Sequence, residues 1–416
     1  MSELAFAPFA RFAEVVMGQS PGADLCNTEE RGLPFLQGCA EFGARHPHSD
    51  VYCSPPLRVA KAGSVLISVR APVGTMNYAD QDYCIGRGLG AFKAKPGVSN
   101  TVFLKHAVEL NAAYLHRRSQ GSTFAAVSTD DVKTVPIPVF KPEKQEKIAT
   151  ILTGIDTAIE KTEALIAKYQ QIKAGLMNDL FTCGVLPNGQ LRPPREQAPE
   201  LYQETAIGWI PREWELKPLG ELCDMTSGGT PSRSMPAYWG GSIPWVKTGE
   251  INYEDISRTE EYITPKGLSA SSAKVFPAGT IVMAMYGEGV TRGRVAILAV
   301  PCASNQACIG FSFGNQIHIK YMYHFFEHCY EELRDLSNDG SQKNLSSGLL
   351  KQFQIRFPTS KAEQACIADR LSNLDQRIAS EKKYLQNLCQ QKLGLMHDLL
   401  TGKVPVKVEE AEVVDG

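Results

Sequence analysis

The sequence predicts a chain in which one architecture occurs twice: a globular segment of mixed structure followed by a long helix, with the two helices paired antiparallel. Three observations support this prediction. A stretch of 38 residues recurs later without a gap, both copies carry the apolar spacing of a coiled coil, and the segments before them share several short motifs. A chain of 416 residues is also too long for one ordinary core.

The recurring stretch covers residues 145–182 and again 364–401, a constant offset of 219 (364 − 145). The sequence Gly-Leu-Met-x-Asp-Leu stands near the end of both copies, at 175–180 and 394–399. Chance does not produce so dense a match over this length without a gap. We therefore infer an internal duplication.

Both copies are predicted to be long helices, because their apolar residues alternate steps of three and four over about five heptads. We call these positions the helix seam. In the first copy they are Ile148, Leu152, Ile155, Ile159, Ile166, Tyr169, Leu176 and Leu180. In the second copy they are Ile367, Leu371, Leu374, Ile378, Leu385, Leu388, Leu395 and Leu399.

Polar residues interrupt both seams at the same places. Thr162 and Lys173 stand in the first copy where Glu381 and Lys392 stand in the second. The shared interruptions favour two helices that pair with each other around a pseudo-twofold axis. The alternative is two unrelated amphipathic helices, each packed on its own core.

The segments before the helices share motifs at an offset of 210. Residues 18–21 (GQSP) match 228–231 (GGTP), and residues 33–36 (LPFL) match 243–246 (IPWV). A glycine followed by an apolar strand recurs at 63–70 and 279–286. Since the offset changes to 219 at the helices, we expect insertions in loops.

These observations divide the chain into six parts. The expected ranges are a first domain (1–140), a first spacer helix (141–184), a polar linker (185–205), a second domain (206–358), a second spacer helix (359–402) and a tail (403–416). Pro142 and Pro358 precede the helices, where a missing N–H costs little, and Gly184 and Gly402 mark their ends.

The composition excludes several classes of protein. No apolar stretch approaches the roughly 20 residues that span a bilayer, and residues 1–11 make a poor signal peptide, so we expect a cytoplasmic protein with no membrane partner. The 11 cysteines show no C-x-x-C spacing. A net charge of −2 argues against a protein that coats nucleic acid on its own, but leaves sequence-specific binding open.

No motif for catalysis or metal binding is found. The chain lacks the nucleotide loop G-x-x-x-x-G-K-[ST] and the zinc motif H-E-x-x-H, and residues 287–293 miss the dinucleotide spacing at Arg292. The pair His46 and His48 is better explained as a solvated loop than as a ligand pair. We therefore nominate no catalytic residue and no metal ligand.

If the chain binds DNA, the candidates for contact are loop residues with Arg, Lys, amide or hydroxyl side chains, because these groups form hydrogen bonds to base edges. In the first domain they are Gln19, Ser20, Arg70, Arg87, Ser122 and Thr123. In the second they are Lys247, Thr248, Tyr286, Arg292, Arg294, Asn305, Gln306, Ser341, Gln342, Lys343 and Asn344. Arg292, Arg294 and Lys343 are the strongest candidates. The alternative for each is a solvated or turn-forming side chain.

Several of these features resemble the specificity subunits of type I restriction–modification enzymes. Residues 207–222 (IGWIPREWELKPLGEL) are similar to the start of that family's second target-recognition domain. Glu363-Gln364 and the two Gly-Leu-Met-x-Asp-Leu ends resemble its conserved regions. The resemblance covers almost the whole chain, although residues 9–15 (FARFAEV) match the family's first domain more loosely.

The resemblance implies two α/β (α+β) target-recognition domains separated by the antiparallel coiled-coil helices. Each domain would recognise one half of a bipartite, asymmetric site in double-stranded DNA. The helices would set the spacer and dock two methyltransferase (modification) subunits, and a motor-nuclease (restriction) subunit would join the complex.

By itself such a chain would be a recognition subunit and not an enzyme, with no cofactor of its own. S-adenosylmethionine would bind to the methyltransferase subunits, and ATP and Mg to the motor-nuclease. Two alternatives remain open at this point: a stand-alone DNA methyltransferase or nuclease with unrecognised motifs, and a scaffold that does not bind DNA.

Overall fold

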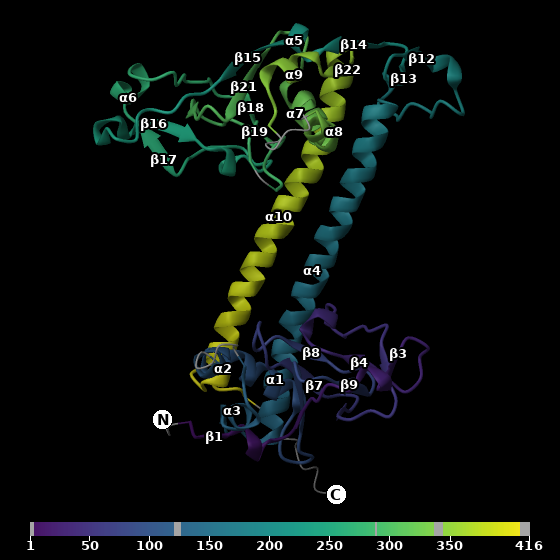
Figure 1. The fold of residues 1–416 in the computed structure, drawn as a ribbon, viewed down its shortest axis with the longest axis vertical. Helices are drawn as coiled ribbons and strands as arrows, with labels where there is room; N and C mark the ends of the chain where they lie inside the picture. Colours follow the sequence, from purple (N-terminus) through teal and green to yellow (C-terminus); the bar gives the residue numbers. More distant parts are fainter. Residues whose placement is uncertain (1–3, 120–125, 288, 337–343, 408–416) are drawn as a thin grey trace, which may run out of the picture. The chain divides into compact units, whose positions relative to one another are not determined.

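A computed structural model describes residues 4–119, 126–287, 289–336 and 344–407 (Figure 1). The chain divides into two compact units. Unit 1 consists of residues 1–166 and 381–416, and unit 2 of residues 167–380. Each unit therefore holds one globular domain and one segment from each of the two long helices. In the described part of the chain, no helix is long and apolar enough to cross a membrane.

The two long helices are α4 (Pro142–Thr182) and α10 (Lys361–Leu400), each drawn as one uninterrupted helix in Figure 1. Both lie within two residues of their expected ends. Gly184 and Gly402 follow them with φ of 69° and 72°, the left-handed conformation that commonly ends a helix. The expected fold of two mixed domains with paired long helices is confirmed.

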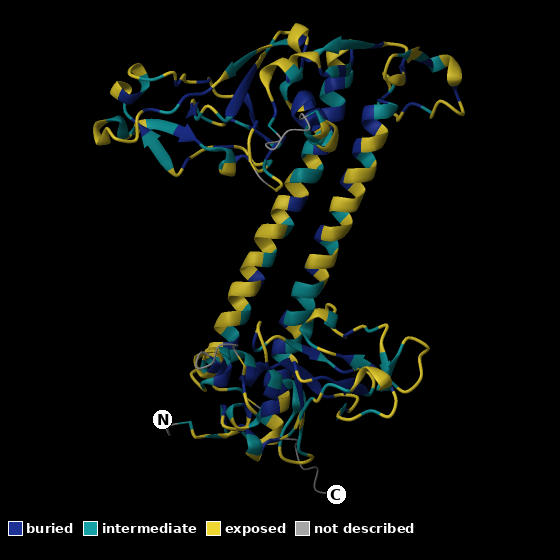
Figure 2. Cartoon of the chain, viewed as in Figure 1, coloured by how far each residue is buried: buried dark blue, intermediate teal, exposed yellow. Residues whose placement is uncertain are grey.

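Within each unit the helix segments run antiparallel. In unit 1 the beginning of α4 and the end of α10 share a core that includes Ile148, Leu152 and Leu399. In unit 2 the end of α4 and the beginning of α10 share another, with Leu180 and Leu371. None of the sixteen helix-seam residues is exposed, while their neighbours on the outer faces are (Figure 2).

A four-stranded antiparallel sheet forms the centre of each domain, with the same strand order in both. In unit 1 the order is β2 (Ala13–Met17), β10 (Leu89–Ala94), β7 (Val65–Ser68) and β8 (Met76–Tyr78). In unit 2 it is β15 (Cys223–Ser227), β21 (Cys308–Phe313), β18 (Ile281–Ala284) and β19 (Val295–Ile297). Strands β7 and β18 are buried along their whole length, as their apolar sequences predict.

A second sheet in each domain is built around one parallel strand pair. In unit 1 the order is β3 (Cys26–Asn27), β5 (Tyr52–Cys53), β4 (Leu33–Leu36), β9 (Tyr83–Ile85) and β6 (Val59–Ala60). In unit 2 it is β17 (Glu261–Ile263), β16 (Trp239–Val246) and β20 (Ala303–Ser304). The parallel pairs β4–β9 and β16–β20 use the repeated motifs 33–36 and 243–246.

A two-stranded sheet precedes each long helix. Its strands are β1 (Phe6–Pro8) and β11 (Pro136–Pro138) in unit 1, and β14 (Trp214–Pro218) and β22 (Gln354–Pro358) in unit 2. Phe6 pairs with Pro138, and Trp214 pairs with Pro358 in the same position. Trp214 is buried and its Nε1 donates to Glu363 at 3.0 Å, whereas Phe6 is 54% exposed.

The range 185–205, expected as a polar linker, has structure of its own. It contains β12 (Tyr202–Thr205), which pairs with β13 (Gly208–Pro211). Arg192 from this range is 1% exposed and bonds to Glu213 at 2.8 Å and to Glu363 at 3.3 Å. Its guanidinium also donates to the carbonyl of Cys183 just after α4. The segment is therefore fixed onto unit 2.

Short helices cover the sheets. They are α1 (Thr101–Leu110), α2 (Ala112–Ser119) and α3 (Thr129–Lys133) in unit 1, and α5 (Leu219–Leu222), α6 (Pro265–Ser269), α7 (Ile319–His328), α8 (Tyr330–Asp335) and α9 (Ser347–Gln352) in unit 2. Asn100 caps α1 by accepting from the N–H groups of Val102 and Phe103. The apolar faces of α1 and α7 join the cores that include α4 and α10.

Candidate nucleic-acid interface

In unit 1 the loop after β2 presses against the turn after β9. The N–H of Gly18 donates to Leu89 and that of Gln19 to Ile85, both at 2.9 Å. A Cβ on Gly18 would overlap the carbonyl of Gly86, so only glycine allows this approach. Gln19 is exposed beside the turn.

Two more candidates reach the same turn. Ser20 Oγ accepts from the N–H of Arg87 at 3.2 Å and donates to Gln37 Oε1 at 3.3 Å. Arg70 follows Val69, whose N–H donates to Gly88 at 3.0 Å. Arg70 and Arg87 are both exposed. We call Gln19, Ser20, Arg70 and Arg87 loop group 1. The other two candidates of this domain, Ser122 and Thr123, lie outside the described residues.

Unit 2 builds an equivalent arrangement from the repeated motif 228–231. The N–H of Gly229 donates to Ser304 at 2.8 Å, and Thr230 Oγ1 donates to Gln306 Oε1. The N–H of Asn305 donates to Val246, the residue before Lys247, at 3.0 Å. The side chain of Asn305 accepts from the N–H of Ala307 at 3.1 Å, which shapes the turn.

Two further loops join this turn. The N–H of Met285, the residue before Tyr286, donates to Ala307 at 2.8 Å. The N–H of Leu345, the residue after Asn344, donates to Met285 at 3.0 Å. Tyr286 is 39% exposed. Loop group 2 consists of Lys247, Tyr286, Asn305, Gln306 and Asn344. Both groups therefore gather polar side chains where the central and parallel strands end.

The three strongest sequence candidates, Arg292, Arg294 and Lys343, are not among the exposed residues of the loop groups. Arg292 is buried, 7% exposed, and burial followed by the charge of Arg334 lowers the pKa of its guanidinium. Arg294 is half-buried, with its guanidinium 5.8 Å from the ring centre of Tyr253. The turn packs against α8, because the hydroxyl of Tyr330 donates to the carbonyl of Val290 at 2.6 Å and Arg334 donates to the carbonyl of Arg292 at 3.3 Å. Lys343, Ser341 and Gln342 lie outside the described residues.

Lys247 and Thr248 lie at the end of β16. Lys247 Nζ bonds to Glu260 at 2.7 Å and lies 3.8 Å from Glu261. The hydrogen bond with Glu260 raises the pKa of Lys247 above its usual value. A phosphate would have to compete with these carboxylates for the ammonium group. Thr248 begins the short turn that follows.

Two residues near these loops were missed. Gln37 touches loop group 1, and it stands 210 residues before Lys247, so the repeat that led to Lys247 could have identified it. Arg233 makes two hydrogen bonds to Glu261, at 2.7 and 2.9 Å, and lies 3.8 Å over the ring of Trp239. In the sequence Arg233 stands six residues before Trp239, and no motif or repeat marks it as a candidate.

Comparison with known proteins points to one family. The family model described as "Type I restriction modification DNA specificity domain" matches residues 57–171 and 211–390, one range in each half. The MjaIX specificity subunit of a type I restriction enzyme from Methanocaldococcus jannaschii is 34% identical over 214 residues, 50% of this chain and 49% of that protein. The MjaVIII specificity subunit from the same organism is 24% identical over 321 residues, 75% of this chain and 72% of that protein.

The fold is also similar to a solved structure. The S subunit of a type I restriction–modification system from M. genitalium superposes with a TM-score of 0.63 at 15% identity, over 98% of both chains.

Two of the sequence alignments with M. jannaschii relatives cover less than half of the relative. They span 40% and 49% of those proteins' lengths.

Proposed function

Because this chain belongs to the family of type I restriction modification DNA specificity domains, we propose that it is the DNA-recognition subunit of a type I restriction–modification complex. The observation that carries the proposal is the pair of loop groups. Each lies at the strand ends of one domain and is built on the same repeated glycine motif. Amide, hydroxyl and arginine side chains there suit hydrogen bonds to base edges.

Two such groups in one chain suit a bipartite target. Each domain recognises one half-site, and because the side chains of the two groups differ, the two half-sites differ in sequence. Among the loop residues, the exposed ones would contact DNA, and the two recognition domains would span residues 1–140 and 206–358. The chain carries no catalysis of its own. S-adenosylmethionine binds to the methyltransferase partners, and ATP and Mg bind to a motor-nuclease partner.

The test uses the purified full chain with and without the modification subunits of its complex. With S-adenosylmethionine and DNA, the chain alone transfers no methyl group, and the complex methylates one bipartite sequence. Methyl transfer by the chain alone would favour a stand-alone methyltransferase. Failure of the complex to protect any discrete DNA site would favour a scaffold that does not bind DNA.

The long helices act as a spacer between the half-sites and as the dock for two modification subunits. With 41 and 40 residues they are each about 60 Å long at 1.5 Å per residue. One heptad inserted after both Ile159 and Ile378 keeps the seam in phase and lengthens the pair by about 10 Å. That length equals about three base pairs of B-DNA, so the methylated sites should acquire a longer gap. An unchanged gap would mean that the helices only bind partners.

A further inference from the structure

Two clusters of charged residues occupy equivalent places in the two units. Each combines a histidine and a glutamate three residues apart on a domain helix with an aspartate from one long helix and a lysine from the other. Lysine cluster 1 contains His106, Glu109, Asp156 and Lys392, and lysine cluster 2 contains His324, Glu327, Asp375 and Lys173. Asp375 follows Asp156, and Lys392 follows Lys173, by the repeat offset of 219.

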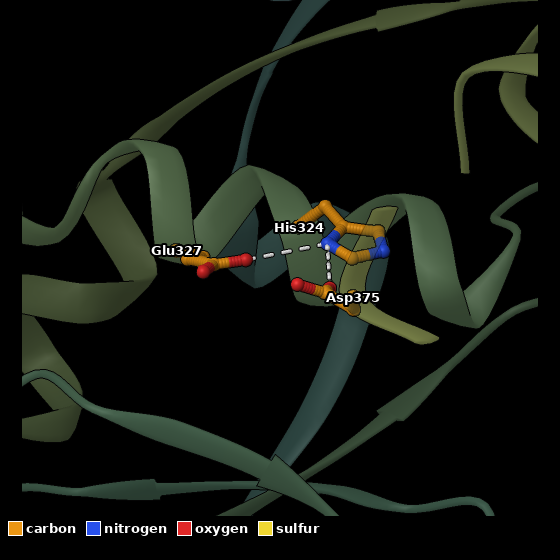
Figure 3. Close-up of side chains that lie close together, drawn as sticks. All are labelled: His324, Glu327 and Asp375. Atoms are coloured by element: carbon orange, nitrogen blue, oxygen red, sulfur yellow. Dashed lines mark hydrogen bonds and ion pairs between the residues drawn. The ribbon is translucent and has the colours of Figure 1, made fainter. Parts of the chain in front are cut away.

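The lysine is the centre of cluster 2. Lys173 is 8% exposed, and its Nζ bonds to Glu327 at 2.6 Å and to Asp375 at 2.7 Å. His324 Nδ1 lies 3.3 Å from Glu327 and 3.8 Å from Asp375 (Figure 3). Its Nε2 lies 3.1 Å from the hydroxyl of Ser372 on α10. The ammonium group thus joins α4 to both α7 and α10.

Cluster 1 repeats this arrangement with one addition. Lys392 Nζ bonds to Glu109 at 2.6 Å and to Asp156 at 2.9 Å, and so joins α10 to α1 and α4. Lys105 of α1 reaches the same two carboxylates at 3.1 and 3.2 Å. In the described part of the chain, cluster 1 therefore holds two ammonium groups where cluster 2 holds one.

The long helices exchange roles between the clusters. Helix α4 supplies the aspartate of cluster 1 and the lysine of cluster 2, and α10 supplies the other two groups. We propose that Lys173 and Lys392 are positioning residues that fix the antiparallel register of α4 and α10 and seat each domain helix on that pair. Their effect on the spacing of half-sites rests on the proposed function, but their effect on the register does not.

The apolar seam cannot fix the register alone. A slip of one heptad brings seam residues back into contact with other seam residues. The same slip carries each lysine about 10 Å along its partner helix. The ammonium group of Lys173, which is 8% exposed, would then lie buried away from its carboxylate partners, and an unpaired buried charge is far more costly than a lost surface pair. The clusters therefore select one register among several that the seam accepts.

A metal site is the other chemistry these residues suggest. The ligand atoms of His324, Glu327 and Asp375 all lie within 4.8 Å of one another (Figure 3). Lys173 Nζ, however, already lies at hydrogen-bond distance from both carboxylates. The positive charge that a metal ion would bring is supplied by the chain itself, so the arrangement favours the positioning role.

The test measures the register directly on the full chain. Spin labels on non-canonical amino acids are placed at exposed positions of both helices, Gln171 with Gln376 in unit 2 and Lys161 with Asn387 in unit 1. Lys173→Met should broaden or shift the unit 2 distance, and Lys392→Met the unit 1 distance. Exposed Lys168→Met is the matched control and should change neither. Single, unchanged distances in a Lys173→Met, Lys392→Met double variant would overturn the proposal.

A second variant decides the matter if the first unfolds. Lys173→Asp with Asp375→Lys exchanges the charges between the helices, and it should restore a single unit 2 distance relative to Lys173→Asp alone. No recovery in the exchanged pair would count against register control by these charges. In the assembled complex, Lys173→Met should also yield methylated sites with more than one gap length. Because the distances are measured without DNA, failure of the proposed function would leave them unaffected.

Discussion

The two halves of the chain agree where each domain meets the long helices and differ at the loops. Gln145 and Gln364 are both fully buried at the helix starts. Each donates to the carbonyl five or six residues before it, Phe140 or Pro358, and each accepts from a backbone N–H just before the domain helix. The lysine clusters and the order of the central sheet are repeated as well.

The differences lie at the rim of each domain. Among the described residues, the second sheet has five strands in unit 1 and three in unit 2, and the Arg233–Trp239 stack of unit 2 has no counterpart in the matched motifs of unit 1. Loop group 1 carries two arginines, an amide and a hydroxyl, whereas loop group 2 carries three amides, a lysine and a tyrosine. The duplication thus preserved the residues that hold each domain in place and changed those that face outward. Such a division suits a protein whose two domains are positioned alike but recognise different sequences.

The largest predicted effect contrasts the two lysine clusters. Lys173→Met removes the one ammonium group of cluster 2 and should cost about 3–5 kcal/mol of local stability in unit 2. Lys392→Met should cost less in unit 1, because Lys105 still reaches Glu109 and Asp156. Native-state hydrogen exchange measures each unit separately. The exposed Lys382→Met is the control for unit 1 and should stay within about 0.5 kcal/mol. Equal losses for both lysines would contradict the role of Lys105.

The two strands before the helices should also respond differently. Trp214→Ala removes a buried side chain and leaves Glu363 with one donor fewer, so it should cost about 3–5 kcal/mol. Phe6 occupies the same position in the β1–β11 pairing but is exposed, and Phe6→Ala should cost less than about 0.5 kcal/mol. Thermal unfolding of the two variants beside the parent chain gives the comparison. A large loss from Phe6→Ala would show that the two strands are more alike than their burial indicates.

Substitutions of Arg87 and Arg292 should have different effects, the first on DNA recognition and the second on stability. Arg87→Ala removes an exposed side chain of loop group 1, and loss of a base contact should cost about 1–3 kcal/mol of binding and relax one target position. Arg292→Ala instead removes a buried side chain and should reduce hydrogen-exchange protection in unit 2. Binding of the assembled complex to single-position target variants is measured for both. If Arg292→Ala relaxed recognition of a target position and left hydrogen-exchange protection unchanged, Arg292 would have to contact DNA.

The smallest predicted effect is a difference between the parent chain and His328→Gln in how the stability of unit 2 depends on pH. Burial, followed by the charge of Arg356, lowers the pKa of His328 to about 4 from a usual value of 6.5. The unfolded chain then binds this proton more readily, so stability is lost as the pH falls from about 6.5 towards 4. His328→Gln should flatten this loss in unit 2, while the exposed His116→Gln should not. Hydrogen exchange at pH 7 and pH 5 tests it, and equal slopes in the parent and His328→Gln chains would contradict it.

The sequence predicts the long helices well, because the regular spacing of the seam lies within each helix and the gapless repeat shows the same spacing twice. It also marks Lys173 and Lys392 as interruptions of the seam. It does not reveal their partners Glu327 and Glu109, since these lie on domain helices more than 100 residues away in the chain. The Gly-rich sequence around Arg292 also does not predict that this side chain is buried, because its burial depends on how the turn packs against α8. The repeat did contain the signal for Gln37, one position after the matched motif 33–36.

The two halves are expected to be positioned alike on the long helices and to recognise DNA independently. The most direct measurement replaces residues 206–358 with the corresponding range of another family member, keeping both long helices. The chimera is assembled with the modification subunits, and its methylated sites are mapped across a genome. We expect one half-site to change while the other half-site and the gap between them stay the same. A change in both half-sites, or in neither, would contradict it.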